Sequence, residues 1–170
     1  MNGQTMLILG DGACVPVRRI RAEDAAALQR LVGRSSDRSV ELRFFGPLKE
    51  LSDDMAERFA DVDGEDRYAL VALDPENLDE IVGVVRYERK VSTDRAEYAA
   101  LIEDRFQHRG LGIGLTRHLI EAARENGIRH LYALVMRENA GMLGLLRSLD
   151  LPERLRWQDG AEYVEIDLVS

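Results

Sequence analysis

The sequence contains one cysteine, no long apolar run and no excess of basic residues. Because Cys14 stands alone, the chain has no internal disulfide framework and no cysteine cluster for a metal. We expect Cys14 to pack as a small apolar side chain. No apolar run approaches the ~20 residues needed to span a bilayer, so we expect no membrane segment. Residues 1–10 lack the basic start and long apolar core of a signal peptide, which favours a cytoplasmic location.

The shortage of positive charge also narrows the class of partner. A net charge of −8 argues against nucleic acid, because phosphate backbones demand a basic protein face. His108, His118 and His130 have no partner at metal-ligand spacing, so we expect no metal. The 170 residues suit one domain spanning residues 1–170, and 45% hydrophobic with 32% charged residues is ordinary for a soluble globular protein.

Strand and helix patterns are mixed along the chain. Runs rich in apolar and β-branched residues predict strands at residues 6–9, 14–20, 68–73, 81–89, 97–103, 131–135, 155–158 and 163–169. Capping residues and apolar stripes predict helices at residues 24–33, 37–44, 52–59, 115–126 and 139–149. We expect the Asp24 side chain to cap the first of these helices. Antiparallel neighbours come first and one β-α-β unit follows, which predicts a mixed α/β (α+β) fold.

The stretch FQHRGLGIG, residues 106–114, joins a predicted strand to a predicted helix. Its glycines remove side chains from the turn, so a ligand can reach backbone N–H groups that have no partner inside the helix. The helix dipole adds positive potential there, which predicts a phosphate or pyrophosphate site. The chain has no P-loop sequence, and the glycine spacing and late position do not fit a dinucleotide-binding fingerprint. A glycine-rich turn without a ligand stays open on these residues alone.

The residues Gln107-His108-Arg109-Gly110-Leu111-Gly112 match (Gln/Arg)-x-x-Gly-x-(Gly/Ala), the acyl-CoA signature of the GNAT N-acetyltransferase superfamily. Residues 19–24 resemble the first strand and helix of that family. The segments RFFGPLKELS (43–52) and GIRHLYALVMRENAGMLGLLRSLDL (127–151) resemble the Pat-type bacterial protein lysine acetyltransferases. The resemblance covers about residues 11–168. It implies the GNAT fold, in which a mixed, mostly antiparallel sheet splays at its middle, between strands 97–103 and 131–135, with helices on both faces.

The resemblance also implies which residues bind acetyl-CoA, the expected cosubstrate. The pyrophosphate should meet the start of the helix, and the pantetheine arm should run along strand 97–103. The implied cofactor-binding residues are Ala100, Leu101, Ile102, Gln107, His108, Arg109, Gly110, Leu111, Gly112, Ile113, Gly114 and Asn139. Arg109 or Arg105 is implied as the partner of the 3′-phosphate.

Acetyl transfer to an amine needs a base, because a lysine amine in water is protonated near neutral pH. Glu97 is the candidate, since it begins the strand that leads into the glycine turn, where Pat-type enzymes carry their catalytic glutamate. A surface carboxylate at a strand end is the alternative. Leu146 occupies the position at which many GNAT enzymes carry a tyrosine as general acid; the Pat-type enzymes lack that tyrosine too. Asp150-Leu151 departs from the usual Gly-Phe.

Three functions therefore stay open. The first is transfer of acetyl from acetyl-CoA to a lysine of a protein, and the second is transfer to a small amine. The third is a non-catalytic module that binds acyl-CoA. The sequence does not name the acceptor, the acyl chain or the oligomeric state, and a homodimer is compatible with it. We expect the pair Phe44-Phe45 to lie in the core, with the wall of the acceptor site as the alternative, and we expect Trp157 to serve packing.

Overall fold

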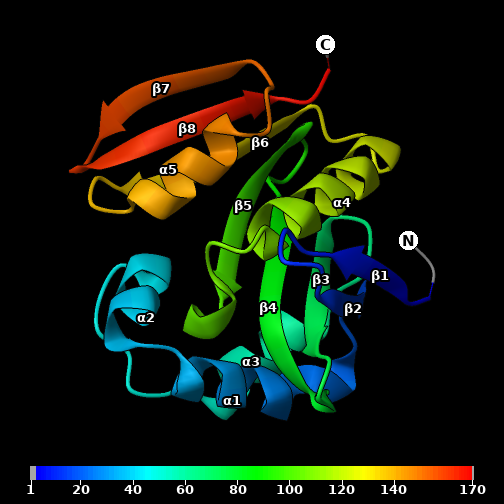
Figure 1. Ribbon diagram of the computed structural model, residues 1–170. Coiled ribbons are helices and arrows are strands. Elements are labelled where there is room, and N and C mark those ends of the chain that lie inside the picture. Colours follow the sequence, from blue (N-terminus) through cyan, green and yellow to red (C-terminus); the bar gives the residue numbers. More distant parts are fainter. Residues whose placement is uncertain (1–2, 170) are drawn as a thin grey trace.

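The computed structural model describes residues 3–169, which form one eight-stranded sheet and five α-helices (Figure 1). The strands are β1 Thr5–Ile8, β2 Cys14–Arg19, β3 Arg67–Asp74, β4 Asn77–Arg89, β5 Arg95–Ile102, β6 His130–Met136, β7 Glu153–Gln158 and β8 Ala161–Asp167. The helices are α1 Ala25–Arg34, α2 Asp37–Phe44, α3 Asp53–Ala60, α4 Leu111–Glu125 and α5 Ala140–Arg147. No helix formed by residues 3–169 is long and apolar enough to cross a membrane.

The strand order is β1-β2-β3-β4-β5-β6-β8-β7, and every neighbouring pair except β5 and β6 is antiparallel. β5 and β6 run parallel and pair through only three residues each, ending at Glu97 and Tyr132. Beyond that point the two strands diverge (Figure 1). The prediction of a mixed, mostly antiparallel sheet that splays between these strands is confirmed.

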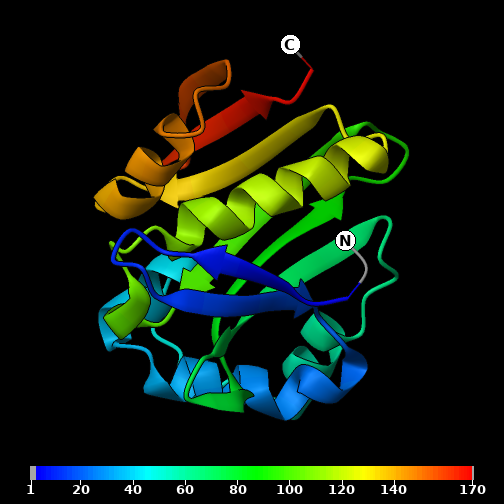
Figure 2. The ribbon, with the colours of Figure 1, turned by 45° about the vertical axis from the view of Figure 1, so that its right-hand side comes forward.

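Helices cover both faces of the sheet and create two apolar cores. One core packs α4 and α5 against the sheet, and it includes Leu115, Leu119 and Leu146. The other packs α1, α2 and α3 against the opposite face, and it includes Leu31 and Val40. Figure 2 shows α4 and the β1–β2 hairpin on one side and α1 and α3 on the other. The V-shaped opening between β5 and β6 therefore has α2 on one flank and α5 on the other.

Most of the predicted elements are present, but two helix starts differ from the prediction. α4 begins at Leu111, four residues before the predicted start. The prediction placed Gly112 and Gly114 in the turn, whereas they lie in the first turn of the helix. The Asp24 side chain makes no capping hydrogen bond to α1. Its carboxylate instead forms a bidentate ion pair with Arg18, with O–N distances of 2.8 and 2.9 Å, and accepts the backbone N–H of Arg21. Rules based on helix propensity and capping consider only neighbouring residues, so they did not predict the contact of Asp24 with Arg18.

The predictions for the side chains of Cys14 and Trp157 are wrong. Cys14 is exposed at the first position of β2, on the opposite face of the strand from the buried Val15 and Val17. Trp157 is 51% exposed on the edge strand β7, where the guanidinium of Arg137 lies 4.1 Å from the centre of its ring. Both residues lie near the end of their strand.

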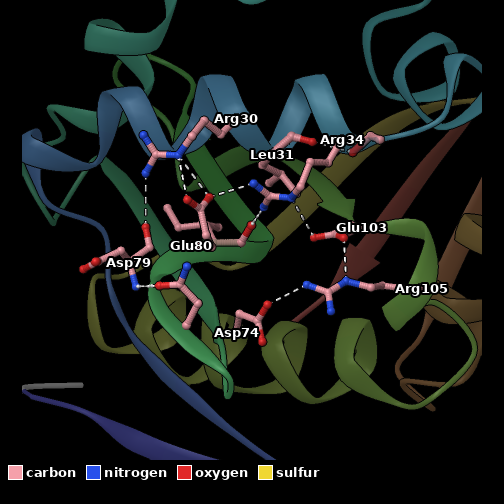
Figure 3. A network of polar contacts seen from close by, with 11 residues as sticks. Arg30, Leu31, Arg34, Asp74, Asp79, Glu80, Glu103 and Arg105 are labelled. Carbon is pink, nitrogen blue, oxygen red and sulfur yellow. Dashed lines mark hydrogen bonds and ion pairs between the residues drawn. The ribbon is translucent and has the colours of Figure 1, made fainter.

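A network of charged side chains anchors the end of β5 to α1 and the β3–β4 turn (Figure 3). Arg34 of α1 bonds Glu80 at 2.7 Å and Glu103 at 3.2 Å. Arg105 then bridges Glu103 and Asp74, each at 2.6 Å. Glu103 is 6% exposed, so this carboxylate depends on both guanidinium groups to offset its desolvation. The network fixes the point from which the chain turns toward α4.

The Arg18–Asp24 pair yields a stability prediction. Burial alone would raise the pKa of Asp24, but hydrogen bonds from Arg18 and the Arg21 N–H outweigh burial, so its pKa lies below the ordinary value. Asp24→Asn should therefore lower the free energy of unfolding at pH 7 by roughly 3 kcal/mol, because Arg18 loses its partner. A carboxylate with a lowered folded-state pKa stabilises above its unfolded pKa of about 3.9 and loses that effect as pH falls through the folded-state pKa.

Urea unfolding at pH 7 and at pH 3 measures both parts of this prediction. The gap between wild type and Asp24→Asn should be large at pH 7 and should shrink at pH 3. Asp94→Asn, which removes an exposed carboxylate, is the control and should unfold like the wild type. A gap that stays constant with pH would contradict a role for the Asp24 charge.

Candidate active site

A cavity of about 520 Å³ occupies the opening between β5 and β6. Its walls come from β5, β6, α2, α5 and the turn before α4. The predicted site residues that line it are Glu97, Ala100, Leu101, Ile102, Gln107, His108, Gly110, Gly112, Ile113 and Asn139. Residues more than 40 positions apart in the sequence thus share one concave surface, as expected of a ligand site.

The turn before α4 exposes backbone donors at one end of the cavity. The first hydrogen bond of the i→i−4 type runs from the Gly114 N–H to the Gly110 carbonyl, at 3.1 Å. By helix geometry, the N–H groups of Leu111, Gly112 and Ile113 have no acceptor within the helix. Gly110 adopts φ +92°, a left-handed conformation that glycine takes without steric cost. The turn therefore presents free N–H groups and the positive end of the helix dipole to an anion.

Gly112 keeps the floor of the cavity open. A Cβ at this position would lie 2.8 Å from the Leu145 Cδ1 of α5 and 3.7 Å from the Ile102 Cγ1 of β5. Any side chain would therefore fill the space between the end of β5 and α5. The second glycine of the motif serves close approach rather than unusual backbone dihedral angles.

Three of the predicted residues do not line the cavity. Leu111 is 1% exposed in the core, and Gly114 packs against Leu7 of β1. The Arg109 guanidinium turns away to Asp11, at 2.7 Å, while its carbonyl accepts the Gly10 N–H. Arg105 is bound to Asp74 and Glu103. Both arginines implied for a 3′-phosphate are thus ion-paired within the chain.

Gln107 holds the turn against its neighbours instead of pointing its amide at a ligand. Its Nε2 donates to the Ile102 carbonyl at 2.9 Å and to the Ser39 Oγ at 3.0 Å. Asp104 accepts from the Ser36 N–H and from the Ser36 and Ser39 hydroxyls, at 2.8 to 3.0 Å. Burial would raise the pKa of Asp104, but these bonds lower it below the ordinary value. The start of α2 and the turn before α4 are therefore joined.

Asn139 and Tyr98 position two helices next to the cavity, α5 and α4. The Asn139 Oδ1 caps α5 by accepting the Met142 N–H at 3.0 Å. The Tyr98 hydroxyl lies 2.7 Å from the Thr116 Oγ1, which in turn donates to the Gly112 carbonyl. Burial raises the pKa of Tyr98 to about 12. This phenol is therefore a link between β5 and α4 and a poor proton donor at neutral pH.

Glu97 lies at the point where β5 and β6 separate. It is opposite Glu88 of β4 and Tyr132 of β6 in the sheet, and its exposed side chain lines the cavity. Its charge raises the pKa of Tyr132, after burial of that phenol, and favours the protonated form of Arg43 on α2. Glu97 thus faces a phenol on one side and a guanidinium on the other.

Sequence reasoning gave no role to Arg43 of α2, and it favoured the core over the cavity wall for Phe45, which follows α2. Arg43 contributes a half-buried guanidinium, and Phe45 is 50% exposed. The prediction of a core position is confirmed for Phe44, which packs with the α1–α3 core, and wrong for Phe45. Phe45 ends α2 with φ +60°, which turns its ring out of the core. The segment 43–52 stood out by resemblance, but the face that each side chain takes depends on this tertiary turn.

The described residues contain no group of three or more His, Cys, Asp or Glu side chains that could hold a metal. The chemistry available to residues 3–169 is therefore that of a carboxylate, backbone donors and a half-buried cation around an elongated cavity. That combination fits anchoring of a phosphate-bearing ligand beside a site for proton removal.

Comparison with known proteins agrees with this geometry. Residues 15–151 match the family described as Acetyltransferase (GNAT) domain. The chain is 34% identical over 142 residues to Acetyltransferase PA5475 of Pseudomonas aeruginosa, covering 83% of this chain and 76% of that protein. It is similar to the crystal structure of the GNAT domain of S. lividans PAT, with a TM-score of 0.89, 32% identity and 96% of each chain covered. The fold also matches yncA of Salmonella typhimurium with its cofactor acetyl-CoA, with a TM-score of 0.71, 17% identity and coverage of 92% and 95%.

The two ends of α4 provide a matched test of the anion site. Gly110 and Gly127 both have left-handed φ values, +92° and +79°, at opposite ends of the helix. Alanine at either position should cost about 1–2 kcal/mol of stability. Only Gly110→Ala should also weaken CoA binding, by about tenfold, because it displaces N–H donors aimed at a charged group. Calorimetric titration with CoA measures this, and equal affinities for the two variants would contradict an anion site at Gly110.

Proposed function

Because the chain belongs to the GNAT acetyltransferase family, we propose that it transfers the acetyl group of acetyl-CoA to a lysine amine of an acceptor protein. Glu97 is the general base in this proposal, and residues 1–170 act as one domain. The observation that carries it is the continuous cavity that joins the free N–H groups of α4 to Glu97. Donor anchoring and proton removal are thereby aligned along one strand.

The donor half of the proposal rests on the unpaired edge of β5. Beyond Glu97, β5 pairs with β4 on one side, while β6 has diverged on the other. Backbone groups of residues 98–102 therefore face the cavity without a strand partner, as at a sheet edge. The pantetheine arm, which carries two amides, would pair with this edge, and the pyrophosphate would meet the N–H groups at the start of α4. The thioester carbonyl would then lie near the Ala100 or Leu101 amide.

The reaction needs three events at the Glu97 end. A lysine amine with a pKa of about 10.4 must lose a proton, which costs ~4 kcal/mol at pH 7.4, and Glu97 accepts it directly or through water. The amine nitrogen attacks the thioester carbon, and a β5 N–H stabilises the oxyanion that forms. The carbon–sulfur bond then breaks, and CoA leaves as a thiolate. Leu146 is buried and carries no proton, so the thiolate leaves unassisted or is protonated by water.

Two observations support a protein lysine as the acceptor. The segments 43–52 and 127–151 resemble the Pat-type protein lysine acetyltransferases. The first covers the end of α2 and the loop that follows it, the second includes β6 and α5, and both contribute residues to the cavity wall. The similarity to the GNAT domain of S. lividans PAT covers 96% of both chains. The absence of the tyrosine at Leu146 fits the same subgroup.

Glu97→Gln tests the base. It removes the proton acceptor while keeping the shape of the side chain, so turnover of acetyl-CoA on lysine-bearing proteins should fall by about 10²- to 10⁴-fold. CoA affinity should stay within twofold of wild type, because the donor end is about five residues along β5. Thiol release and mass spectrometry of acetyl-lysine measure the two steps.

Glu88→Gln is the matched control, because Glu88 is the cross-strand neighbour of Glu97 and its ion pair with Arg58 is exposed. Its turnover should equal that of the wild type. Equal turnover by Glu97→Gln would remove Glu97 as the base. Rapid turnover of a small amine, or tight CoA binding without turnover on any acceptor, would overturn the protein-lysine function.

A further inference from the structure

Arg43 is a cation in the cavity wall without a matching anion. Its guanidinium lies 4.6 Å from the centre of the Phe44 ring and 5.7 Å from that of Phe59. Among residues 3–169, no side chain or carbonyl forms a hydrogen bond or ion pair with Arg43. Burial lowers the pKa of this half-buried group. A partly buried guanidinium with no partner among residues 3–169 is stabilised when a ligand anion accepts its N–H donors.

Glu97 faces Arg43 across the cavity without touching it. The two charges attract, since Glu97 favours the protonated form of Arg43, yet no ion pair within 4.0 Å joins them in the described chain. Glu97 is fixed by the pairing of β5 with β4 and β6, while α2 is fixed through Ser36 and Ser39 to Asp104. Both groups line the same cavity, so a ligand can enter between them.

A second guanidinium increases the positive potential beside Arg43. Arg86 of β4 lies 4.6 Å from the centre of the Phe59 ring and donates to the Phe59 carbonyl at 2.9 Å. Burial lowers its pKa to about 9, and the charge of Arg43 contributes to that shift. The structure therefore places two guanidinium groups around one phenylalanine ring, next to a single carboxylate in the cavity wall. Such an arrangement favours an incoming anion.

We propose that Arg43 binds a carboxylate of the acceptor, located beside the amine from which Glu97 removes a proton. This inference rests on the proposed function and narrows its substrate class to lysines that are flanked by an aspartate or glutamate in the acceptor protein. The negative Glu97 and the positive Arg43 match an ammonium group and a carboxylate held a short distance apart. The planar guanidinium offers paired donors to both carboxylate oxygens, which supplies direction as well as charge.

Paired peptides test the assignment. One peptide carries a single lysine flanked by glutamates, and the other replaces the glutamates with glutamine. Wild-type enzyme should favour the glutamate peptide by about ten- to hundredfold in kcat/KM, mainly through KM. Arg43→Gln should lower kcat/KM for the glutamate peptide at least about tenfold more than for the glutamine peptide, and Arg43→Lys should retain part of the preference. Free lysine serves as a third acceptor.

Arg38→Gln is the matched control, since Arg38 lies on the same helix, is exposed and changes the charge equally. It should keep the wild-type preference. If Arg43 acted only on the ionisation of Glu97, Arg43→Gln would change kcat and its pH profile equally for both peptides, which would overturn the inference. Higher turnover of free lysine than of the glutamate peptide would indicate that Arg43 binds the α-carboxylate of a free amino acid. That result would overturn the inference that the carboxylate belongs to an acceptor protein.

Peptide affinity for the CoA-loaded protein, measured by calorimetry, separates this inference from the proposed function. Tighter binding of the glutamate peptide, lost in Arg43→Gln, supports the inference even without turnover. Equal binding of the two peptides overturns it, whereas turnover of both would leave the proposed function standing. Thermal unfolding of each variant identifies any loss of binding that comes from misfolding. If Arg43→Gln is misfolded, the binding of the two peptides to Arg43→Lys tests the inference instead.

Discussion

The separation of β5 from β6 after three residue pairs is the constraint on which the rest of the site depends. Continued pairing would have buried the backbone of residues 98–102 between two strands. Because β6 turns away instead, one edge of β5 stays unpaired in the interior of a sheet, where an unpaired edge is otherwise costly. The edge can be satisfied by a ligand that imitates a strand. The same divergence leaves Glu97 at the narrow end of the opening, where the last pair still fixes its backbone.

Several contacts keep the opening from closing, and each uses a residue type suited to its position. The hydrogen bonds of Gln107 stop the turn from folding over the end of β5, and the Tyr98–Thr116 contact fixes the distance between β5 and α4. Asn139 caps the start of α5, three residues after β6 ends at Met136. The ion pairs of Glu103 fix the position of the chain after β5. They add little net stability, because the desolvation of the charges offsets most of their attraction.

Local sequence rules correctly predicted the turns whose shape depends on the backbone conformation of a few adjacent residues. The Asp159-Gly160 turn of the last hairpin follows from two left-handed residues, and the glycine turn before α4 follows from the need for bare backbone. The resemblance implied residues for acetyl-CoA mostly through backbone position, and most of these residues line the cavity. Long-range partners were out of reach: Asp11 binds Arg109 from 98 residues away. Helix propensity gave no reason to begin α4 at Leu111, because the glycines there are selected by packing against Leu145 and Leu7.

The hydrogen bonds that join α2 to the turn before α4 have a thermodynamic consequence. Ser39 belongs to the helix that carries Arg43, while Gln107 belongs to the turn at which we propose that the donor binds. A ligand that orders one of these two elements also restricts the other, so a second ligand causes a smaller loss of conformational entropy when it binds. Reciprocity then requires that donor and acceptor strengthen each other's binding by one common factor. The affinity for an acceptor is in this sense a property of the CoA-loaded protein.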